Sequence, residues 1–453
     1  MQKLTKIPAG CELPQLHEIV DTKKLSETLY KYLSNSDTGI AKVAGCKINN
    51  LYYKPGGDCR VLFTADLQPE QNGENSEQLF FGRVFPSGKA RAEFQSLKMD
   101  KLAAPKFGPP AMYIPEWETV LWAFPNDPKL PGLSMLMDAN SVTEAMKAAP
   151  ESFGMKTPPA KISARQTKYV PGRRCGFIFE AEFDNNGDAG AAGKHPVYGK
   201  AYQAGEGEKA YHIMKQIWDS DARNSDELLL PQPYSFDQEN SIIWQEVVPG
   251  RPLAKIAPQL DNLAELAIEI GHRLAAYHNT SLDLATIMTL DFQLDDLRFS
   301  EEKINAAFPD FAADCSAVAQ KLYRSAEALA QDFRTPVHAS FKFSHIFIGE
   351  RGVTFIDFDN ANIGDPGYDL GRFIAHLYKM KNSGKIAQKT AEETVSNFCD
   401  AYNDAAKQTI SRNHINWWAA SHLVGSQVYK AVKRMNSRAV AGLLADANAL
   451  CPA

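Results

Sequence analysis

The first half of the chain alternates short runs of β-branched and aromatic residues with polar, glycine-containing turns, whereas the second half has helical periodicity. Residues 51–67 (LYYKPGGDCRVLFTADL) have the pattern of two strands joined by a Pro-Gly turn. Apolar residues recur at i, i+3 and i+4 across residues 263–277, and residues 313–333, 391–406 and 415–435 have comparable patterns. We therefore expect a β-rich region followed by a helical region.

The strand pattern of residues 51–67 occurs a second time. These residues align with residues 167–183 (TKYVPGRRCGFIFEAEF), and the self-similarity indicates a duplicated structural unit, although two β-hairpins can also share turn chemistry alone. Five identities keep a constant offset of 116 positions: Tyr53 with Tyr169, Pro55 with Pro171, Gly56 with Gly172, Cys59 with Cys175 and Phe63 with Phe179.

Each copy continues in the same way after its hairpin. A polar tip leads to a returning strand at residues 79–85 or 197–202, and a later strand contains Trp122 or Trp244. The predicted parts of the chain are an N-terminal lead over residues 1–44, a first β-rich unit over residues 45–140, a second over residues 160–250, and a helical part over residues 251–453.

The chemistry of the chain is concentrated in residues 336–376 (PVHASFKFSHIFIGERGVTFIDFDNANIGDPGYDLGRFIAH). The apolar runs HIFI and VTFIDF flank Gly352 and predict a strand pair, which would bring His338, His345 and Asp357 to strand ends near one cleft. A carboxylate among apolar neighbours requires a metal, a cation or backbone donors as a partner. The alternative is that Asp357 caps the next turn.

These motifs resemble those of the aminoglycoside phosphotransferase and choline kinase family, which is related to protein kinases. That family typically has His-Gly-Asp followed after four residues by Asn, then an Ile-Asp-Trp/Phe strand end and a Gly-Asp-Pro-x-x-Asp-Leu turn. This chain has His338, IDFD at residues 356–359 and GDPGYDLG at residues 364–371. The resemblance extends over about Lys161 to Arg434. It implies an α+β, bilobal protein kinase-like fold with a duplicated β-rich N-terminal lobe and a helical C-terminal lobe.

The resemblance also implies ATP and Mg²⁺ as cofactors, with Mn²⁺ as a second metal. Asp357 would hold the metal that bridges the nucleotide phosphates, and His345 and Asp359 are the further metal candidates. His338 would stiffen the catalytic loop, and Lys342 is placed to contact the transferred phosphate; the alternative for Lys342 is a solvated loop charge.

Two positions depart from the family pattern. Ser340 stands where the family has its catalytic Asp, and His345 stands where it has a metal-binding Asn. A serine without a nearby base cannot accept the proton of a substrate hydroxyl, and a positioned base is worth roughly 10² to 10⁴ in rate. A neutral imidazole suits Zn²⁺ or Mn²⁺ better than Mg²⁺, which prefers oxygen.

The second β-rich unit is expected to cover the nucleotide. Lys200 in VYGKAY fits the strand lysine that pairs with phosphates and with a helical Glu, either Glu206 or Glu208, and its alternative is an edge-strand lysine that deters aggregation. The first unit has Arg83 at this position and is interpreted as a non-catalytic duplicate. The other nucleotide candidates are Arg173 and Arg174 at the hairpin turn, and the backbone near Gln245 and Val247 at the hinge.

Composition and charge limit the classes of partner that we expect the protein to bind. A net charge of -5, a pI near 6.1 and the lack of a basic block argue against a nucleic-acid or membrane-surface binder. The seven cysteines have no Cys-x-x-Cys spacing and are expected to be free thiols, and the N-terminal residues have no signal-peptide pattern. We expect a cytoplasmic protein.

Two main functional hypotheses follow. The first is an ATP-dependent phosphotransferase of a small hydroxylated molecule, such as a sugar, an aminoglycoside or an amino alcohol. The second is a pseudokinase that binds nucleotide or a protein partner without phosphoryl transfer, which the changes at Ser340 and His345 favour. A different use of the nucleotide, such as transfer of AMP, is a third alternative.

Overall fold

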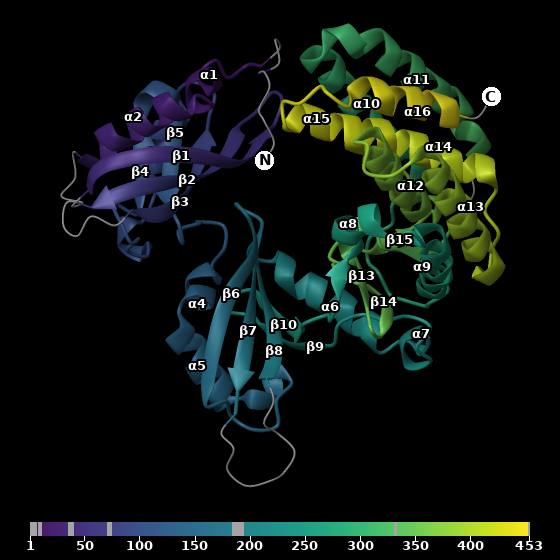
Figure 1. Cartoon of the computed structure of the whole chain (residues 1–453), viewed down its shortest axis with the longest axis horizontal. Helices are drawn as coiled ribbons and strands as arrows, with labels where there is room; N and C mark the ends of the chain where they lie inside the picture. The colour runs from purple at the N-terminus through teal and green to yellow at the C-terminus, as the bar shows by residue number, and fades with distance from the viewer. Residues whose placement is uncertain are drawn as a thin grey trace. The chain divides into compact units, whose positions relative to one another are not determined.

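The computed structural model describes residue 7 and residues 11–34, 40–69, 75–183, 194–329 and 333–451 (Figure 1). The polar tips predicted after the two hairpins fall largely outside these residues. The chain forms two compact units. The first contains residues 1–207, 236–243 and 432–436, and the second contains residues 208–235, 244–431 and 437–453.

The first unit carries two antiparallel sheets with the same strand order, which supports the predicted duplication. One sheet has the order β1-β2-β3-β5-β4 and the other has the order β6-β7-β8-β10-β9, so the likeness extends beyond the hairpins. The strands of the first sheet are β1 (Ile40–Tyr53), β2 (Cys59–Pro69), β3 (Ser76–Val84), β4 (Ala111–Ile114) and β5 (Thr119–Ala123). Those of the second are β6 (Lys161–Val170), β7 (Arg174–Glu182), β8 (Lys194–Tyr202), β9 (Pro233–Asp237) and β10 (Ile242–Glu246).

The two hairpins also have the same register next to their turns. Tyr53 pairs with Cys59 across the first hairpin, and Tyr169 pairs with Cys175 across the second. On the following strand, Cys59 faces Val84 and Cys175 faces Ala201, so Arg83 and Lys200 hold equivalent positions one residue earlier.

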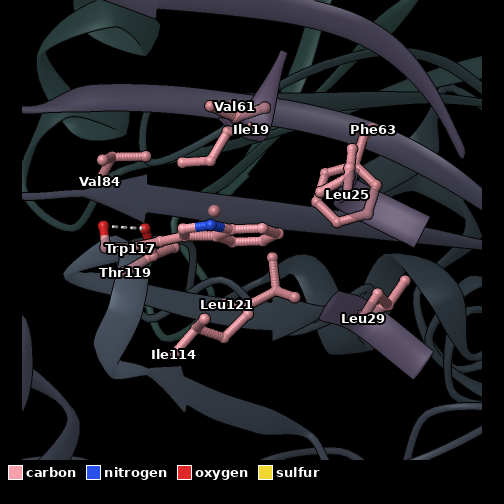
Figure 2. Close-up of a pocket in the computed structure, with 11 residues that line it drawn as sticks. Ile19, Leu25, Leu29, Val61, Phe63, Val84, Ile114, Trp117, Thr119 and Leu121 are labelled. Atoms are coloured by element: carbon pink, nitrogen blue, oxygen red, sulfur yellow. Dashed lines mark hydrogen bonds between the residues drawn. The ribbon is translucent and has the colours of Figure 1, made fainter. Parts of the chain in front are cut away.

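Short helices cover one face of the first sheet. In α1 (Leu16–Ile19) and α2 (Thr22–Ser34), the apolar residues Ile19, Leu25 and Leu29 face the sheet because they recur at helical spacing. Figure 2 shows them around Trp117, where they enclose a cavity of about 10 Å³. Space of this size with an apolar lining is a packing gap. The other helices of this unit are α3 (Ala90–Gln95), α4 (Leu133–Met137) and α5 (Ala139–Ala148).

The second unit is mainly helical and contains the predicted strand pair. β13 (Ile346–Gly349) and β14 (Gly352–Phe355) form an antiparallel hairpin that also pairs with β11 (Arg251–Pro252), while β12 (Thr335–Val337) pairs with β15 (Asn362–Gly364). The helices in or bordering this unit are α6 (Glu206–Trp218), α7 (Asp221–Asn224), α8 (Leu253–Ile256), α9 (Leu263–His278), α10 (Leu290–Ala307), α11 (Ala312–Ser325), α12 (Gly367–Asn382), α13 (Gln388–Ala405), α14 (Arg412–His422), α15 (Tyr429–Lys433) and α16 (Val440–Leu450).

One predicted helix differs from the structure. The pattern over residues 415–435 predicts a continuous helix, but α14 and α15 are separated by a π-helical turn at Leu423–Val428. A π turn widens the helix locally without ending it, so the apolar spacing on either side stays helical. Within the described residues, no helix is long and apolar enough to cross a membrane. All seven cysteines are free, as expected.

Candidate active site

The loop between β12 and β13 carries the predicted catalytic residues in a constrained shape. The ring of His338 is fully buried, stacks on Phe358 with ring centroids 4.6 Å apart, and has its Nε2 atom 3.1 Å from the carbonyl oxygen of Ile356. Burial lowers the pKa of His338, which keeps the imidazole neutral. Ala339 has a φ of 54°, a left-handed conformation that costs an L-residue roughly 1–2 kcal/mol. The packing of His338 therefore holds the loop in a strained conformation.

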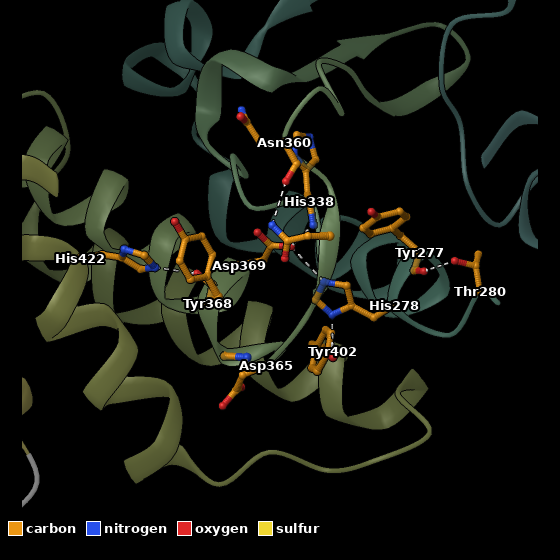
Figure 3. A network of polar contacts seen from close by, with 12 residues as sticks. Tyr277, His278, Thr280, His338, Asn360, Asp365, Tyr368, Asp369, Tyr402 and His422 are labelled. Atoms are coloured by element: carbon orange, nitrogen blue, oxygen red, sulfur yellow. Dashed lines mark hydrogen bonds and ion pairs between the residues drawn. The ribbon is translucent and has the colours of Figure 1, made fainter. Parts of the chain in front are cut away.

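A buried carboxylate on α12 braces this loop. The Asp369 Oδ2 atom accepts a 2.6 Å hydrogen bond from the backbone N–H of His338 and lies 3.1 Å from Nε2 of His278. The other ring nitrogen of His278 lies 2.8 Å from the hydroxyl of Tyr402 (Figure 3). Burial and the charge of Asp369 raise the pKa of Tyr402, so its hydroxyl stays protonated. Four segments distant in sequence thus meet at one carboxylate.

A second carboxylate of the GDPGYDLG motif opens α12. The Asp365 Oδ1 atom accepts a 2.7 Å hydrogen bond from the backbone N–H of Gly367, and its Oδ2 atom lies 2.7 Å from Nε2 of His414. An acidic residue that binds an N–H in the first turn of a helix is favourable. Asp365 therefore stabilises the start of α12, while Asp369 braces the loop.

The predicted metal residues His345 and Asp357 are brought together. The His345 Nε2 atom lies 2.9 Å from the Asp357 Oδ2 atom, and the Asp357 side chain is 12% exposed. Burial lowers the pKa of His345 to about 3, so the imidazole is neutral and can donate one N–H to the carboxylate. Asp357, like Ala339, is left-handed, with a φ of 70°. Across the described part of the chain, no three His, Cys, Asp or Glu side chains gather into a metal cluster, so Asp359 does not extend this pair into one.

Ser340 and Lys342 complete the loop. Ser340 is buried, with 5% exposure, and its side chain offers no carboxylate to a substrate hydroxyl. Lys342 is half-buried, and its carbonyl accepts a 2.7 Å hydrogen bond from the N–H of His345 in the 3₁₀ turn Phe343–His345. The charge of Lys342 also contributes to the lowered pKa of His345, after burial and against the raising effect of Asp357. The lysine is thus close to the His345–Asp357 pair.

The predicted strand lysine, Lys200, lies in the second β-rich copy, which belongs to the first compact unit. Lys200 lies on β8 with 7% exposure, and its Nζ atom is 4.7 Å from the ring centroid of Tyr202, a cation–π geometry. Glu206 and Glu208 on α6 are both exposed, and Glu208 Oε1 lies 3.9 Å from Nε2 of His212. The pairing of Lys200 with either glutamate stays a prediction.

The hairpin turn between β6 and β7 presents two arginines. Arg173 is exposed and Arg174 is half-buried. The backbone N–H of Gly172 donates a 2.6 Å hydrogen bond to the carboxylate of Asp127, which also accepts a 2.9 Å bond from the hydroxyl of Tyr169. That N–H is therefore already occupied, and an anion contact of the two arginine side chains stays a prediction.

The hinge residues lie at the end of β10, with Gln245 inside the strand and Val247 directly after it. Gln245 and Val247 are half-buried. Between them, Glu246 makes an ion pair with Arg351 at 2.6 Å and accepts a 3.1 Å hydrogen bond from the N–H of Gln232. The segment is therefore held by its own side-chain contacts.

Sequence reasoning missed an ion-pair network in the first β-rich copy. Arg83 Nε donates to a carboxylate oxygen of Asp58, and Arg83 Nη1 lies 3.1 Å from Glu93 Oε1. These residues line an open cleft of about 620 Å³. The sequence held a signal for this ion pair. In kinases a strand Lys pairs with a Glu on the following helix, and here Arg83 on β3 is followed by Glu93 on α3.

Comparison with known proteins agrees with the motifs. Residues 198–402 match the family described as the phosphotransferase enzyme family. No curated protein matches the chain. The resemblance to this family is therefore confirmed for residues 198–402.

Several solved structures are similar to the chain. A thermostable mutant of an aminoglycoside phosphotransferase, in a complex with ADP and hygromycin B, has 15% identity over 68% of this chain and 98% of its own, with a TM-score of 0.45. A putative aminoglycoside phosphotransferase from Ralstonia eutropha has 16% identity over 69% and 98%, with a TM-score of 0.45. A choline kinase from Cryptosporidium parvum has 9% identity over 68% and 94%, with a TM-score of 0.44.

Proposed function

We propose that residues 198–402, the part of the chain that matches the phosphotransferase enzyme family, bind ATP with a divalent metal and transfer its terminal phosphoryl group to a small hydroxylated molecule. The strained backbone at Ala339 and Asp357 carries this proposal. Non-glycine residues persist in left-handed conformations when their surroundings over-determine them, and such residues cluster at functional sites. Both lie in the segment that presents Ser340, His345 and Asp357.

Asp357 is the residue proposed to hold the metal. A bound divalent metal bridges phosphate oxygens and neutralises the charge that develops on them. The carboxylate fits this role because it is partly exposed and Mg²⁺ is bound through one or two carboxylates together with substrate phosphates. His345 donates its Nε2–H to Asp357 in the proposed arrangement, because its Nδ1 atom is buried and, among the residues that the structure describes, has no partner that could accept a proton from it. It orients the carboxylate.

The remaining residues are proposed to position the substrates. Lys342 contacts the transferred phosphate, Lys200 contacts the other phosphates with Glu208 as its partner, and the backbone near Gln245 and Val247 meets the adenine edge. Arg173 and Arg174 are proposed to add positive charge for binding the phosphates.

The transfer is proposed to proceed without a carboxylate base. The acceptor hydroxyl oxygen forms a bond to the γ-phosphorus while the bond to the β–γ bridging oxygen breaks, ADP leaves, and the hydroxyl proton passes to the transferred phosphoryl group. A loose transition state places little demand on a base. Without the base, the rate is expected to be roughly 10² to 10⁴ lower than in a family member that has it.

Calorimetric titration of ATP with Mg²⁺ or Mn²⁺ into the full chain tests nucleotide binding, and ATP turnover with a panel of hydroxyl acceptors tests transfer. We expect metal-dependent binding and slow, acceptor-dependent turnover that Asp357→Ala abolishes. The matched variant Asp359→Ala separates the loss of the metal ligand from the loss of a nearby carboxylate. Metal-independent binding, or none, would refute the proposal.

The second candidate is a pseudokinase, which the buried serine at position 340 favours. Ser340→Asp restores the family pattern and distinguishes the two functions. Turnover that rises by at least about tenfold means that the base was the missing part of a working site. ATP binding without turnover in either protein means that the site is used for binding alone.

A further inference from the structure

The turn between β6 and β7 has both polar groups of its central peptide bond held by residues from outside the second sheet. The carbonyl oxygen of Pro171 accepts a 3.0 Å hydrogen bond from Arg60 Nη1. At the other end of the same peptide bond, the N–H of Gly172 donates a 2.6 Å hydrogen bond to Asp127 Oδ2. Pro171 and Gly172 are buried, and buried backbone groups are nearly always paired. We call Arg60 and Asp127 the turn clamp.

Both residues of the turn clamp come from the first β-rich copy. Arg60 lies on β2, and Asp127 follows the end of β5. Asp127 is 7% exposed, and its Oδ1 atom accepts a 3.1 Å hydrogen bond from the N–H of Lys129. Its Oδ2 atom also accepts a 2.9 Å hydrogen bond from the hydroxyl of Tyr169. The carboxylate is therefore fixed in place, and it connects the two copies within one compact unit.

The residues of the turn do not by themselves select one orientation of its central peptide. The N–H of Arg173 donates a 3.0 Å hydrogen bond to the carbonyl of Val170, which closes a four-residue turn around Pro171 and Gly172. Gly172 has a φ of 67°, as a type II turn requires. A type I turn differs by a flip of the central peptide, and glycine adopts positive and negative φ about equally. The two bonds to the turn clamp hold the observed orientation.

The equivalent turn of the first copy has different surroundings. Its backbone is the same, because Gly56 has a φ of 73° and the N–H of Gly57 closes the turn with a 2.8 Å hydrogen bond. Gly56 is exposed, so water can bond to its N–H. This turn ends with Gly57 and Asp58, whereas the clamped turn ends with Arg173 and Arg174. The buried, clamped turn is thus the one that carries two adjacent arginines.

We propose that Arg60 and Asp127 are positioning residues for phosphate binding, an inference that rests on the proposed function for the role of Arg173 and Arg174. By fixing the peptide bond before Arg173, the turn clamp restricts the positions that the two guanidinium groups can take. Less conformational freedom is then lost when a phosphate binds, and the affinity is higher. The first β-rich copy therefore acts on the phosphate site without contacting the phosphates.

Calorimetric titration of the full chain with ATP and Mg²⁺, and separately with inorganic tripolyphosphate, tests the turn clamp. Arg60→Met removes the donor and keeps an unbranched side chain, and we expect it to weaken binding of both ligands by about fourfold. In Arg60→Lys, the ammonium can donate to the same carbonyl, so the affinities should stay within about 1.5-fold of wild type. Arg91→Met, at an exposed arginine on α3 of the same copy, is the matched control and should leave them unchanged.

A double-mutant cycle separates positioning from a general effect on the fold. If Arg60 acts through the arginines of the turn, Arg60→Met should cost less than about 1.5-fold in the Arg173→Gln, Arg174→Gln background. An equal loss in both backgrounds would overturn the inference. If circular dichroism shows that Arg60→Met does not fold, Tyr169→Phe replaces it in the same cycle. This variant removes one hydrogen bond to Asp127 and should cost about twofold in the wild-type background alone.

The two ligands distinguish this inference from the proposed function. A wild type that binds tripolyphosphate in an Arg60-dependent way but does not bind ATP refutes the proposed function and leaves the turn clamp standing. A wild type that binds ATP equally well in Arg60→Met and Arg91→Met refutes the turn clamp alone. A wild type that binds neither ligand refutes both.

Discussion

The two β-rich copies share strand order and the register at their hairpin turns, yet the charged residues that end these turns have opposite signs. In the first copy, Arg83 on the strand is neutralised by Asp58 at the hairpin turn and by Glu93. In the second, Lys200 holds the equivalent strand position, and the turn residues that correspond to Gly57 and Asp58 are Arg173 and Arg174. One scaffold therefore holds its own carboxylate where the other gathers positive charge. Two arginines at a turn attract phosphates more than an aspartate does, and the role of the first copy as a non-catalytic duplicate stays a prediction.

We expect the largest difference in ATP affinity between variants of the two equivalent strand residues, Lys200 and Arg83. Lys200→Ala should weaken ATP binding by at least about tenfold, because a hydrogen bond to a charged group contributes roughly 1.5–3 kcal/mol. Arg83→Ala, at the equivalent position, should change it by less than about twofold. Calorimetric titration of both variants with ATP and Mg²⁺ measures the difference. If the two losses were equal, the copies would have equivalent roles.

A smaller effect is expected when the second turn is given the residues of the first. The double variant Arg173→Gly, Arg174→Asp should weaken ATP binding by about fivefold at low ionic strength, since exposed charges are screened by salt. Titrations at several NaCl concentrations provide the check. The wild-type affinity should fall with salt more steeply than that of the variant, and parallel slopes would remove the arginines from the nucleotide site.

Removing the internal carboxylate of the first copy should affect stability. Asp58→Ala leaves the partly buried Arg83 with one partner and is expected to lower the free energy of unfolding by about 1 kcal/mol. Urea denaturation of the full chain measures this. Glu77→Ala, at an exposed position of the same sheet, is the control and should stay within about 0.5 kcal/mol of wild type. A stabilised Asp58→Ala protein would argue that the carboxylate serves something other than the fold.

The smallest difference is expected in the iodoacetamide reactivity of the equivalent cysteines, Cys59 and Cys175. Burial raises the pKa of Cys59 well above its usual value and that of Cys175 to about 12, so both thiols stay protonated at neutral pH. Neither should react with iodoacetamide in the folded protein, and mass spectrometry of digested protein can verify this. Rapid labelling of one alone would show that the two hairpins differ in stability.

The sequence was sufficient to predict what depends on spacing along the chain. Patterns along the sequence predicted three features that the structure has: the repeat, the hairpin around Gly352 and the proximity of His345 to Asp357. Features that are set by packing between distant segments were not predictable in this way. The left-handed backbone at Ala339 and the π turn before α15 are set by tertiary packing, since neither residue type nor apolar spacing marks them.

The carboxylate of Asp369 joins His338, His278 and Tyr402 through direct or relayed contacts, and this has a consequence for biosynthesis. A chain emerging from the ribosome has made β12 and the loop after it well before α12 and α13 exist. Until Asp369 has been added, the loop lacks the carboxylate that binds its backbone, and the full network also requires Tyr402. The loop between β12 and β13 therefore reaches its final form late, after α12 has been synthesised.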